Sequence, residues 1–211
     1  MGAHSNFLEA KNMIHIAEKT RIPVPNVFAC YTYCPTDIRI FYDTYIFMDF
    51  IDGDTLHTVW NTSDVATKTR ISTQLTIQEM RDLGNGGYIG FINHRPVADH
   101  CLSTSVDKSP FQSEKDFNTA LLEETYQRAA PKRHIGSFLS CFLPPTNIMV
   151  KNGNVVAIIG WELSGWYPEY WEIAKALLIW GWQKDWTDYM RILQPYQAQY
   201  FMHQFLDKLL I

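Results

Sequence analysis

Apolar and polar positions follow two different periods along this chain, and the period changes from one segment to the next. Residues 6–19 place apolar side chains at helical spacing, which predicts a helix that Pro23 ends. Residues 27–33 and 39–50 are rich in aromatic and β-branched side chains, which favour strands. A turn around Pro35 would join these two segments, so we expect an antiparallel pair.

Helical patterns return in the remainder of the chain, where one hairpin interrupts them. A turn at 52–54 can cap the first of these helices. The predicted helices cover residues 55–60, 63–83, 114–129, 172–180, 185–193 and 198–210. Two short apolar runs, 148–150 and 155–159, flank Asn152-Gly153, a pair that strongly favours a two-residue hairpin turn. Helices combined with small antiparallel sheets in this order predict an α+β fold.

Composition and charge narrow the class of protein. The 211 residues suffice for one domain or for one domain with a small lobe, and 46% hydrophobic with 19% charged residues is an ordinary globular balance. The net charge of -4 provides no basic field, so we expect neither nucleic acid nor membrane as a partner. The absence of a secretory signal and of a bilayer-spanning apolar run predicts a cytoplasmic protein. The cysteines match no zinc pattern, so we expect no bound metal.

The most informative segment is a loop that leads into two short strands. Residues 143–150 are Leu-Pro-Pro-Thr-Asn-Ile-Met-Val, and residues 155–162 are Val-Val-Ala-Ile-Ile-Gly-Trp-Glu. Together they resemble the catalytic loop and the metal-binding strand of the aminoglycoside phosphotransferase family, especially its fungal members. Other segments are similar to the family in the same order along the chain, namely residues 21–25, 45–53, 87–90 and 165–172.

The resemblance implies a protein-kinase-like fold with two lobes. Residues 1–53 would form the remnant of the N-terminal lobe, with a helix, a β-hairpin and a hinge. Residues 54–211 would form a mostly helical C-terminal lobe that contains a hairpin at 147–160. In the family, three strands precede the helix that contains Glu9, and they carry the phosphate loop and a Lys that pairs with this Glu. Because only a few residues precede Glu9 here, we expect those first strands to be missing.

The sequence departs from the family where the chemistry is done. The family's catalytic loop begins His-Gly-Asp, and here those positions are Ser140, Cys141 and Phe142. The family's metal-binding Asp is Gly160 in this chain. Kinase-type phosphoryl transfer needs the Lys–Glu pair, the metal Asp and the loop Asp together. We therefore expect no transfer of phosphate from ATP with Mg²⁺, and neither a cofactor nor a metal.

Ten residues are candidates for a site built on this frame. Carboxylate, amide and imidazole groups are candidates for catalysis because they can move or hold protons: Glu162, Asn147, Asp99 and His100. Aromatic rings beside polar groups are candidates for substrate contact: Cys141, Phe142, Trp161, Trp166, Tyr167 and Glu169. Structural roles compete with these in several cases. Asn147 can hold its loop through the backbone, Phe142 and Trp161 can fill the core, and Asp99 and His100 can be solvated loop residues.

These observations favour a kinase-like protein whose small-molecule cleft now serves cofactor-free chemistry. The predicted reaction is a cyclisation or isomerisation of a small, apolar metabolite, in line with secondary metabolism because the resemblance is to fungal members. A non-catalytic pseudokinase that binds or scaffolds, or a residual small-molecule phosphotransferase, are the alternatives. An unpaired strand edge at 39–50 invites pairing, so we also expect a homodimer through this edge.

Overall fold

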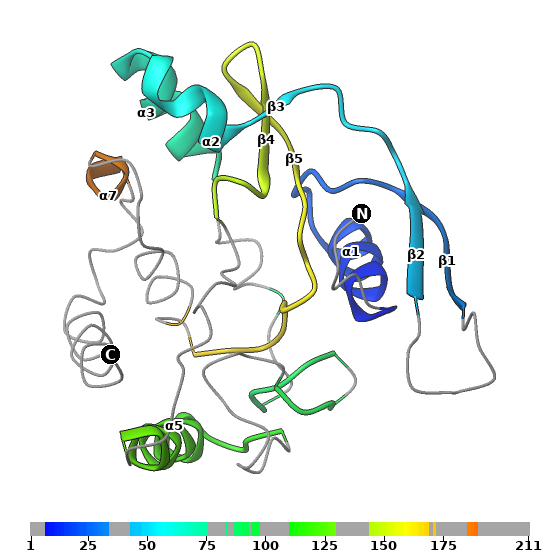
Figure 1. Cartoon of the computed structure of the whole chain (residues 1–211), viewed down its shortest axis with the longest axis vertical. Helices are drawn as coiled ribbons and strands as arrows, with labels where there is room; N and C mark the ends of the chain where they lie inside the picture. The colour runs from blue at the N-terminus through cyan, green and yellow to red at the C-terminus, as the bar shows by residue number, and fades with distance from the viewer. Residues whose placement is uncertain are drawn as a thin grey trace. The chain divides into compact units, whose positions relative to one another are not determined.

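The fold is given by a computed structural model of the chain, drawn in Figure 1. It describes residues 7–33, 43–75, 83, 87–92, 94–97, 110–129, 144–168, 171 and 185–189. The contacts within the chain divide it into two compact units. Unit 1 comprises Met1–Leu83 and Pro145–Ser164, and unit 2 comprises Gly84–Pro144 and Gly165–Ile211. The lobe boundary expected at residue 53 stays a prediction.

Unit 1 begins with a helix and an antiparallel strand pair, as predicted. Helix α1 (Phe7–Lys19) buries Ala10, Met13 and Ile16, which recur at helical spacing and form one face. Strands β1 (Val27–Tyr33) and β2 (Asp43–Met48) pair next to it, and Figure 1 shows α1 beside this ribbon. The expected start of β2 at residue 39 lies outside the described residues.

A second, three-stranded sheet has the order β3-β4-β5, formed by Asp54–Thr55, Ile148–Lys151 and Asn154–Ile158. The predicted hairpin is confirmed. Asn152 and Gly153 connect β4 to β5 with φ values of 52° and 71°. Positive φ at both central residues is the requirement of a type I′ turn, which matches the twist of the flanking strands.

The prediction that the turn at 52–54 caps the following helix was wrong, because the N-cap of that helix is Thr55. Asp54 belongs instead to strand β3, where it pairs with Val150. Gly53 permits this close approach, because a Cβ atom there would lie 2.8 Å from the carbonyl oxygen of Val150. The helix expected at 55–60 is observed as α2 (Leu56–Val59) followed by a 3₁₀ turn (Trp60–Thr62).

Helix α3 (Val65–Gln74) begins as the sequence predicts and ends earlier than residue 83. The Asp64 side chain accepts a 2.8 Å hydrogen bond from the backbone N–H of Thr67, which is the geometry of an N-cap. At Leu75 the backbone leaves the helical region, with ψ at 62°, and residues 76–82 lie outside the described residues.

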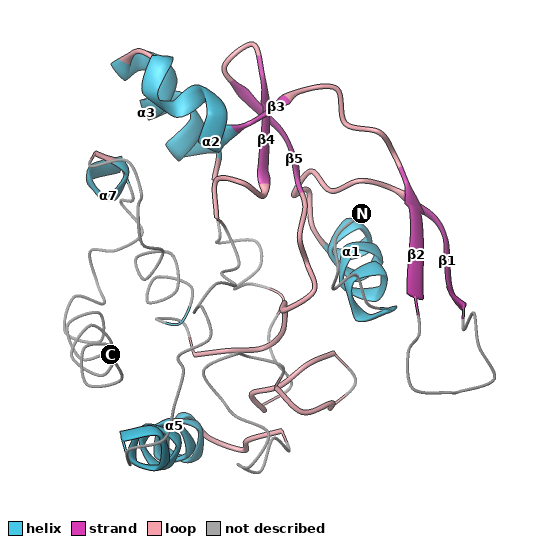
Figure 2. Cartoon of the chain, viewed as in Figure 1, coloured by secondary structure: helices cyan, strands magenta, loops and turns pink. Residues whose placement is uncertain are grey.

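Unit 2 is organised around helix α5 (Glu114–Ala129), which has the predicted bounds. Its core gathers Ile89, Val97, Phe117, Ala120, Leu121 and Trp171. Helix α7 (Trp186–Tyr189) falls within the helix predicted at 185–193, whereas the helices predicted at 172–180 and 198–210 lie outside the described residues. The named strands all belong to unit 1 (Figure 2).

Small antiparallel sheets and helices together confirm the α+β class. In the part of the chain that the structure describes, no helix combines the length and the apolar character that crossing a bilayer requires.

Candidate functional site

A tight turn at Trp161–Ser164, which follows β5, is the centre of the candidate site. The backbone N–H of Ser164 donates to the carbonyl oxygen of Trp161 at 3.2 Å and closes the turn. The Trp161 side chain is buried, and its indole N–H donates to the Ile158 carbonyl at 2.8 Å. The turn is therefore fixed on one side by the end of the strand.

Helix α1 fixes the same turn from the other side. The buried Asn12 side chain donates through Nδ2 to the carbonyl oxygens of Trp161 at 2.7 Å and of Ser164 at 3.1 Å. One turn earlier on the helix, the Glu9 carboxylate accepts a hydrogen bond from the backbone N–H of Trp161. Residues three apart lie on one helix face, so both side chains reach the turn together.

The hydrogen bonds between α1 and the turn bring the Glu9 carboxyl group within the electrostatic influence of Glu162. The pKa of Glu9 is raised from 4.5 to about 7, mainly because burial disfavours the charged form and in addition because the negative charge of Glu162 opposes ionisation. The hydrogen bond from Trp161 acts in the opposite direction and is the smallest of these causes. Glu9 can therefore gain or lose a proton near neutral pH, which is what a general acid or base requires.

Strand β1 contributes a third group to this neighbourhood. Burial raises the pKa of the Cys30 thiol, and the charge of Glu9 adds to the effect. Cys30 forms no disulfide. A thiol that is held protonated is a weak nucleophile, so the arrangement favours proton transfer at Glu9 over covalent chemistry at Cys30.

Asn147 directly precedes strand β4, and its side chain packs against Gly160, the residue before the turn. Gly160 has a φ of 75°, and a Cβ atom there would fall on the side-chain amide of Asn147. The Asn147 amide donates to the Gly160 carbonyl at a long 3.5 Å, and its backbone oxygen accepts from the Ile159 N–H at 2.8 Å. This placement corresponds to the structural role considered for Asn147, and it leaves no room for a side chain at position 160.

Trp166 and Tyr167 belong to unit 2, whereas Trp161, Glu162 and Asn147 belong to unit 1. The Trp166 backbone exchanges hydrogen bonds with Gly90 at 2.6 and 2.8 Å. The Tyr167 ring stacks on Trp171 with centroids 6.0 Å apart and packs against the core of unit 2.

The remaining candidates, Asp99, His100, Cys141, Phe142 and Glu169, lie outside the described residues. Sequence reasoning did not select Glu9 or Asn12 as site residues. A usable pattern was present, because Glu9 stands four and seven positions before Met13 and Ile16, which form the buried face of α1. A carboxylate at this spacing is expected to lie next to the buried face of the helix and to be partly shielded from water.

Among the described residues, no group of three or more His, Cys, Asp or Glu side chains is placed to hold a metal ion. Compared with models of protein families and with curated proteins, the chain shows no match. The family resemblance stays a prediction from the motifs quoted above.

Proposed function

We propose that this protein is a kinase-like fold in which cofactor-free acid–base chemistry on a small, apolar metabolite has replaced phosphoryl transfer. The reaction class is an isomerisation or a cyclisation. One observation carries the proposal: the half-buried Glu9 carboxyl has a pKa of about 7, which the charge of Glu162 helps to raise, and Glu162 lies on a turn that Asn12 of α1 holds through two hydrogen bonds. Preorganised groups of this kind stabilise charge that develops during a reaction.

The two carboxyl groups suffice for a balanced proton transfer. Protonated Glu9 donates its proton to a carbonyl oxygen or an alkene carbon of the substrate, and the positive charge moves to a neighbouring carbon. In an isomerisation, an adjacent carbon loses a proton to Glu162, and the electron pair of the broken C–H bond becomes the new double bond. In a cyclisation, the π electrons of a second double bond first form the ring bond to the cationic carbon, and the same loss of a proton then neutralises the new cation. Transfer of that proton from Glu162 to Glu9 restores the starting state. No net proton, electron or phosphate is consumed, so the product is an isomer of the substrate.

The departures from the aminoglycoside phosphotransferase pattern support this proposal over residual phosphotransfer. Phe142 replaces the loop Asp and cannot accept a proton from an attacking hydroxyl. Gly160 replaces the metal Asp, and its positive φ and contact with Asn147 favour glycine at this position. The order of α1, a strand ribbon, helices and the β4–β5 hairpin also agrees with a kinase-like chain.

A screen by product mass tests the proposal. The full chain is incubated with a panel of apolar metabolites that carry carbonyl or alkene groups, once with a chelator and no nucleotide, and once with ATP and Mg²⁺. We expect a product of unchanged mass and altered retention in the first arm. Its rate should follow the protonation of Glu9, with a midpoint near pH 7. Glu162→Gln removes the group that accepts the proton from the substrate and should abolish turnover. In this variant the titration midpoint of the Glu9 carboxyl, followed by ¹³C NMR, should lie lower, because a charge that raises the Glu9 pKa has been removed.

Glu9→Gln should abolish this turnover, and Glu18→Gln, at an exposed position of the same helix, is the matched control that should not change it. A phosphorylated product that requires ATP and Mg²⁺ and disappears on replacement of Glu162 would overturn the proposal. Saturable binding of a metabolite without conversion would instead favour the alternative below.

A non-catalytic binding module is the second candidate, and one observation favours it. The β1–β2 ribbon carries a stacked aromatic row, in which the Tyr31 ring lies 5.8 Å from Tyr45 and 5.5 Å from Phe47. Tyr31 and Phe47 are exposed, so this face offers apolar area to a partner. The homodimer predicted through the edge at 39–50 stays a prediction, and this ribbon is where it would form.

A further inference from the structure

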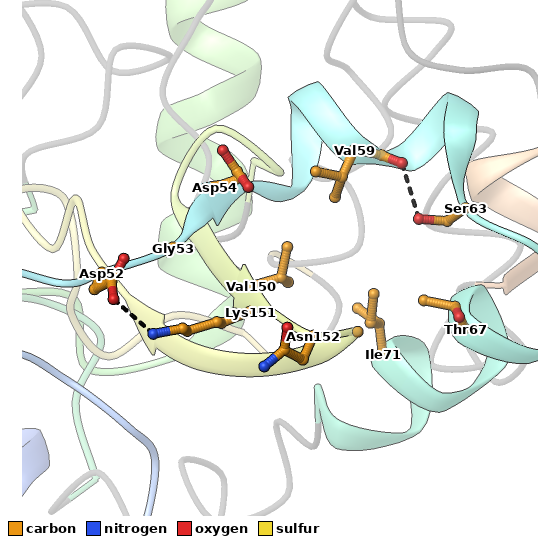
Figure 3. A pocket seen from close by; sticks show the side chains of 11 residues that line it. Asp52, Gly53, Asp54, Val59, Ser63, Thr67, Ile71, Val150, Lys151 and Asn152 are labelled. Atoms are coloured by element: carbon orange, nitrogen blue, oxygen red, sulfur yellow. Dashed lines mark hydrogen bonds and ion pairs between the residues drawn. The ribbon is translucent and has the colours of Figure 1, made fainter.

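A hollow of about 390 Å³ lies in unit 1 between the β3–β4–β5 sheet and helices α2 and α3 (Figure 3). Four segments line it: residues 52–54, the end of α2, helix α3 with Ser63 before it, and the end of β4 with the β4–β5 turn. Its volume falls within the range of small-molecule sites, which is about 300 to 1,000 Å³. The candidate site at Glu9 shares no residue with it.

The walls of the hollow are tied together by contacts across the sequence. Gly53 brings residues 52–54 against the backbone of Val150. Arg70 in α3 donates through Nε to the Gly153 carbonyl at 2.8 Å, and Gln74 accepts from the Val155 N–H at 2.8 Å. Helix α3 is thus fastened to the hairpin at two points, so the hollow is formed before any ligand arrives and little ordering free energy is needed on binding.

The lining divides into an apolar floor and a polar rim. Ile71 and Val150 close the base of the hollow and are almost completely buried, so the half-buried Val59 is the aliphatic side chain that a ligand can reach (Figure 3). The rim carries carboxylate, ammonium, hydroxyl and amide groups from Asp52, Asp54, Ser63, Thr67, Lys151 and Asn152. A ligand that fits would combine a compact apolar body with one polar end.

The charges of the rim select the sign of that polar end. Asp52 and Asp54 oppose one ammonium, that of Lys151, so the lining carries a net negative charge at neutral pH. Lys151 Nζ lies 2.6 Å from the Asp52 carboxylate, so an ammonium group already occupies one place on this rim. The Asp54 carboxylate makes no hydrogen bond or ion pair with any residue that the structure describes.

We propose that this hollow binds a small molecule with a primary amine next to a compact apolar group. The ammonium group would lie at Asp54, and the apolar group would cover Val59 and the methyl group of Thr67. The inference is independent of the acid–base function proposed above, because either site can exist without the other.

Matched probes test the inference by NMR on the ¹⁵N-labelled full chain. Benzylamine and benzyl alcohol share the same ring and differ in the charged group. Benzylamine is expected to shift the amide signals of residues 52–54 and 150–153 saturably, with a dissociation constant of roughly 1 mM for a ligand of this size. Benzyl alcohol should bind about three- to fivefold more weakly, which is the contribution of one exposed ion pair.

Two variants locate the binding. Asp54→Asn should weaken benzylamine about three- to fivefold, whereas Asp43→Asn, an exposed acid in β2, is the matched control and should leave it unchanged. Val59→Phe fills the hollow without removing a charge and should abolish binding. Equal affinity for the amine and the alcohol, an unchanged Asp54→Asn variant, or no saturable shift of these amides up to about 20 mM probe would overturn the inference.

Discussion

Two pairs of acidic residues in unit 1 have opposite surroundings. Glu9 and Glu162 lie at the turn that α1 clamps, where burial is the main cause of the raised Glu9 pKa. Asp52 and Asp54 lie on the rim of the hollow, where the Asp52 side chain is 79% exposed and bound to a Lys151 side chain that is 48% exposed. At the turn, a backbone N–H is the hydrogen-bond partner of Glu9. At the hollow, the Lys151 ammonium group is the partner of Asp52, and the rest of that carboxylate faces solvent.

The comparison shows that solvent, more than residue type, decides what a carboxylate can do. Withdrawal from water makes a carboxyl group exchange its proton near neutral pH, which suits chemistry. Contact with water keeps a carboxylate charged and screens its ion pairs, which suits weak recognition of cations. Each prediction below tests one side of this difference, beginning with the largest expected effect.

The backbone next to the turn should be the most sensitive position. Gly160→Ala places a Cβ atom onto the Asn147 amide and forces alanine into the left-handed region at φ 75°. The backbone penalty is about 1–2 kcal/mol, and overpacking adds about 1–2 kcal/mol. We expect a loss of about 2–4 kcal/mol in the free energy of unfolding, measured by urea denaturation with an unchanged slope.

Gly87→Ala separates the two causes of this loss. Gly87 has a similar φ of 85°, but a Cβ atom there meets no atom within 4 Å, so only the backbone penalty applies. Adding Asn147→Ala to Gly160→Ala should recover part of the lost stability, since it removes the contact. If the double variant lost as much stability as the two single variants added together, the packing of Asn147 on Gly160 would not be a real constraint.

The buried charge should be visible as a pH dependence of stability. The Glu9 carboxyl has a pKa of about 7 in the folded protein and 4.5 as the model value for the unfolded chain, so the folded state binds this proton more tightly. Stability should therefore fall as the pH rises from 4.5 to about 7 and remain constant above. Glu9→Gln removes this dependence and should keep the hydrogen bond from Trp161, because its amide oxygen can accept it.

One pKa unit corresponds to about 1.4 kcal/mol, and solvent screening at a half-buried group reduces the expected gain. Glu9→Gln should be more stable than the parent chain by about 1–2 kcal/mol at pH 8 and nearly equal to it at pH 4. Glu18→Gln makes the same chemical change at an exposed position of α1 and serves as the control. A constant difference between pH 4 and pH 8 would show that Glu9 does not titrate differently on folding.

Sequence patterns predicted those elements whose formation depends on neighbouring residues. The spacing of Ala10, Met13 and Ile16 defines α1, and Asn152-Gly153 defines the β4–β5 hairpin, because side-chain periodicity and positive φ are properties of neighbouring residues. Glu162 was selected because it follows the position of the family's metal Asp, and in the structure its charge contributes to the raised pKa of Glu9.

Features that depend on distant partners were not predicted. Strand β3 exists because Val150 lies next to Asp54, about a hundred positions along the chain, and two residues carry too little pattern to announce a strand. The role of Asn12 depends likewise on the Trp161 and Ser164 carbonyls. The hollow arises between segments that are separate in sequence, so none of its lining residues stood out as a candidate.

The smallest effect is expected at the exposed ion pair, which sharpens the comparison from the other side. Lys151→Ala removes the partner of Asp52, and because both groups face water, the free energy of unfolding should change by less than about 1 kcal/mol. The same variant leaves both rim carboxylates without an ammonium group, so benzylamine should bind about two- to threefold more tightly at low salt, and the gain should shrink as salt is added. Lys19→Ala, which removes an exposed ammonium at the end of α1, is the matched control. If Lys151→Ala destabilised the fold as strongly as Gly160→Ala, the rim would be a structural element, and the contrast between a buried acid that holds a proton and exposed acids that attract a cation would fail.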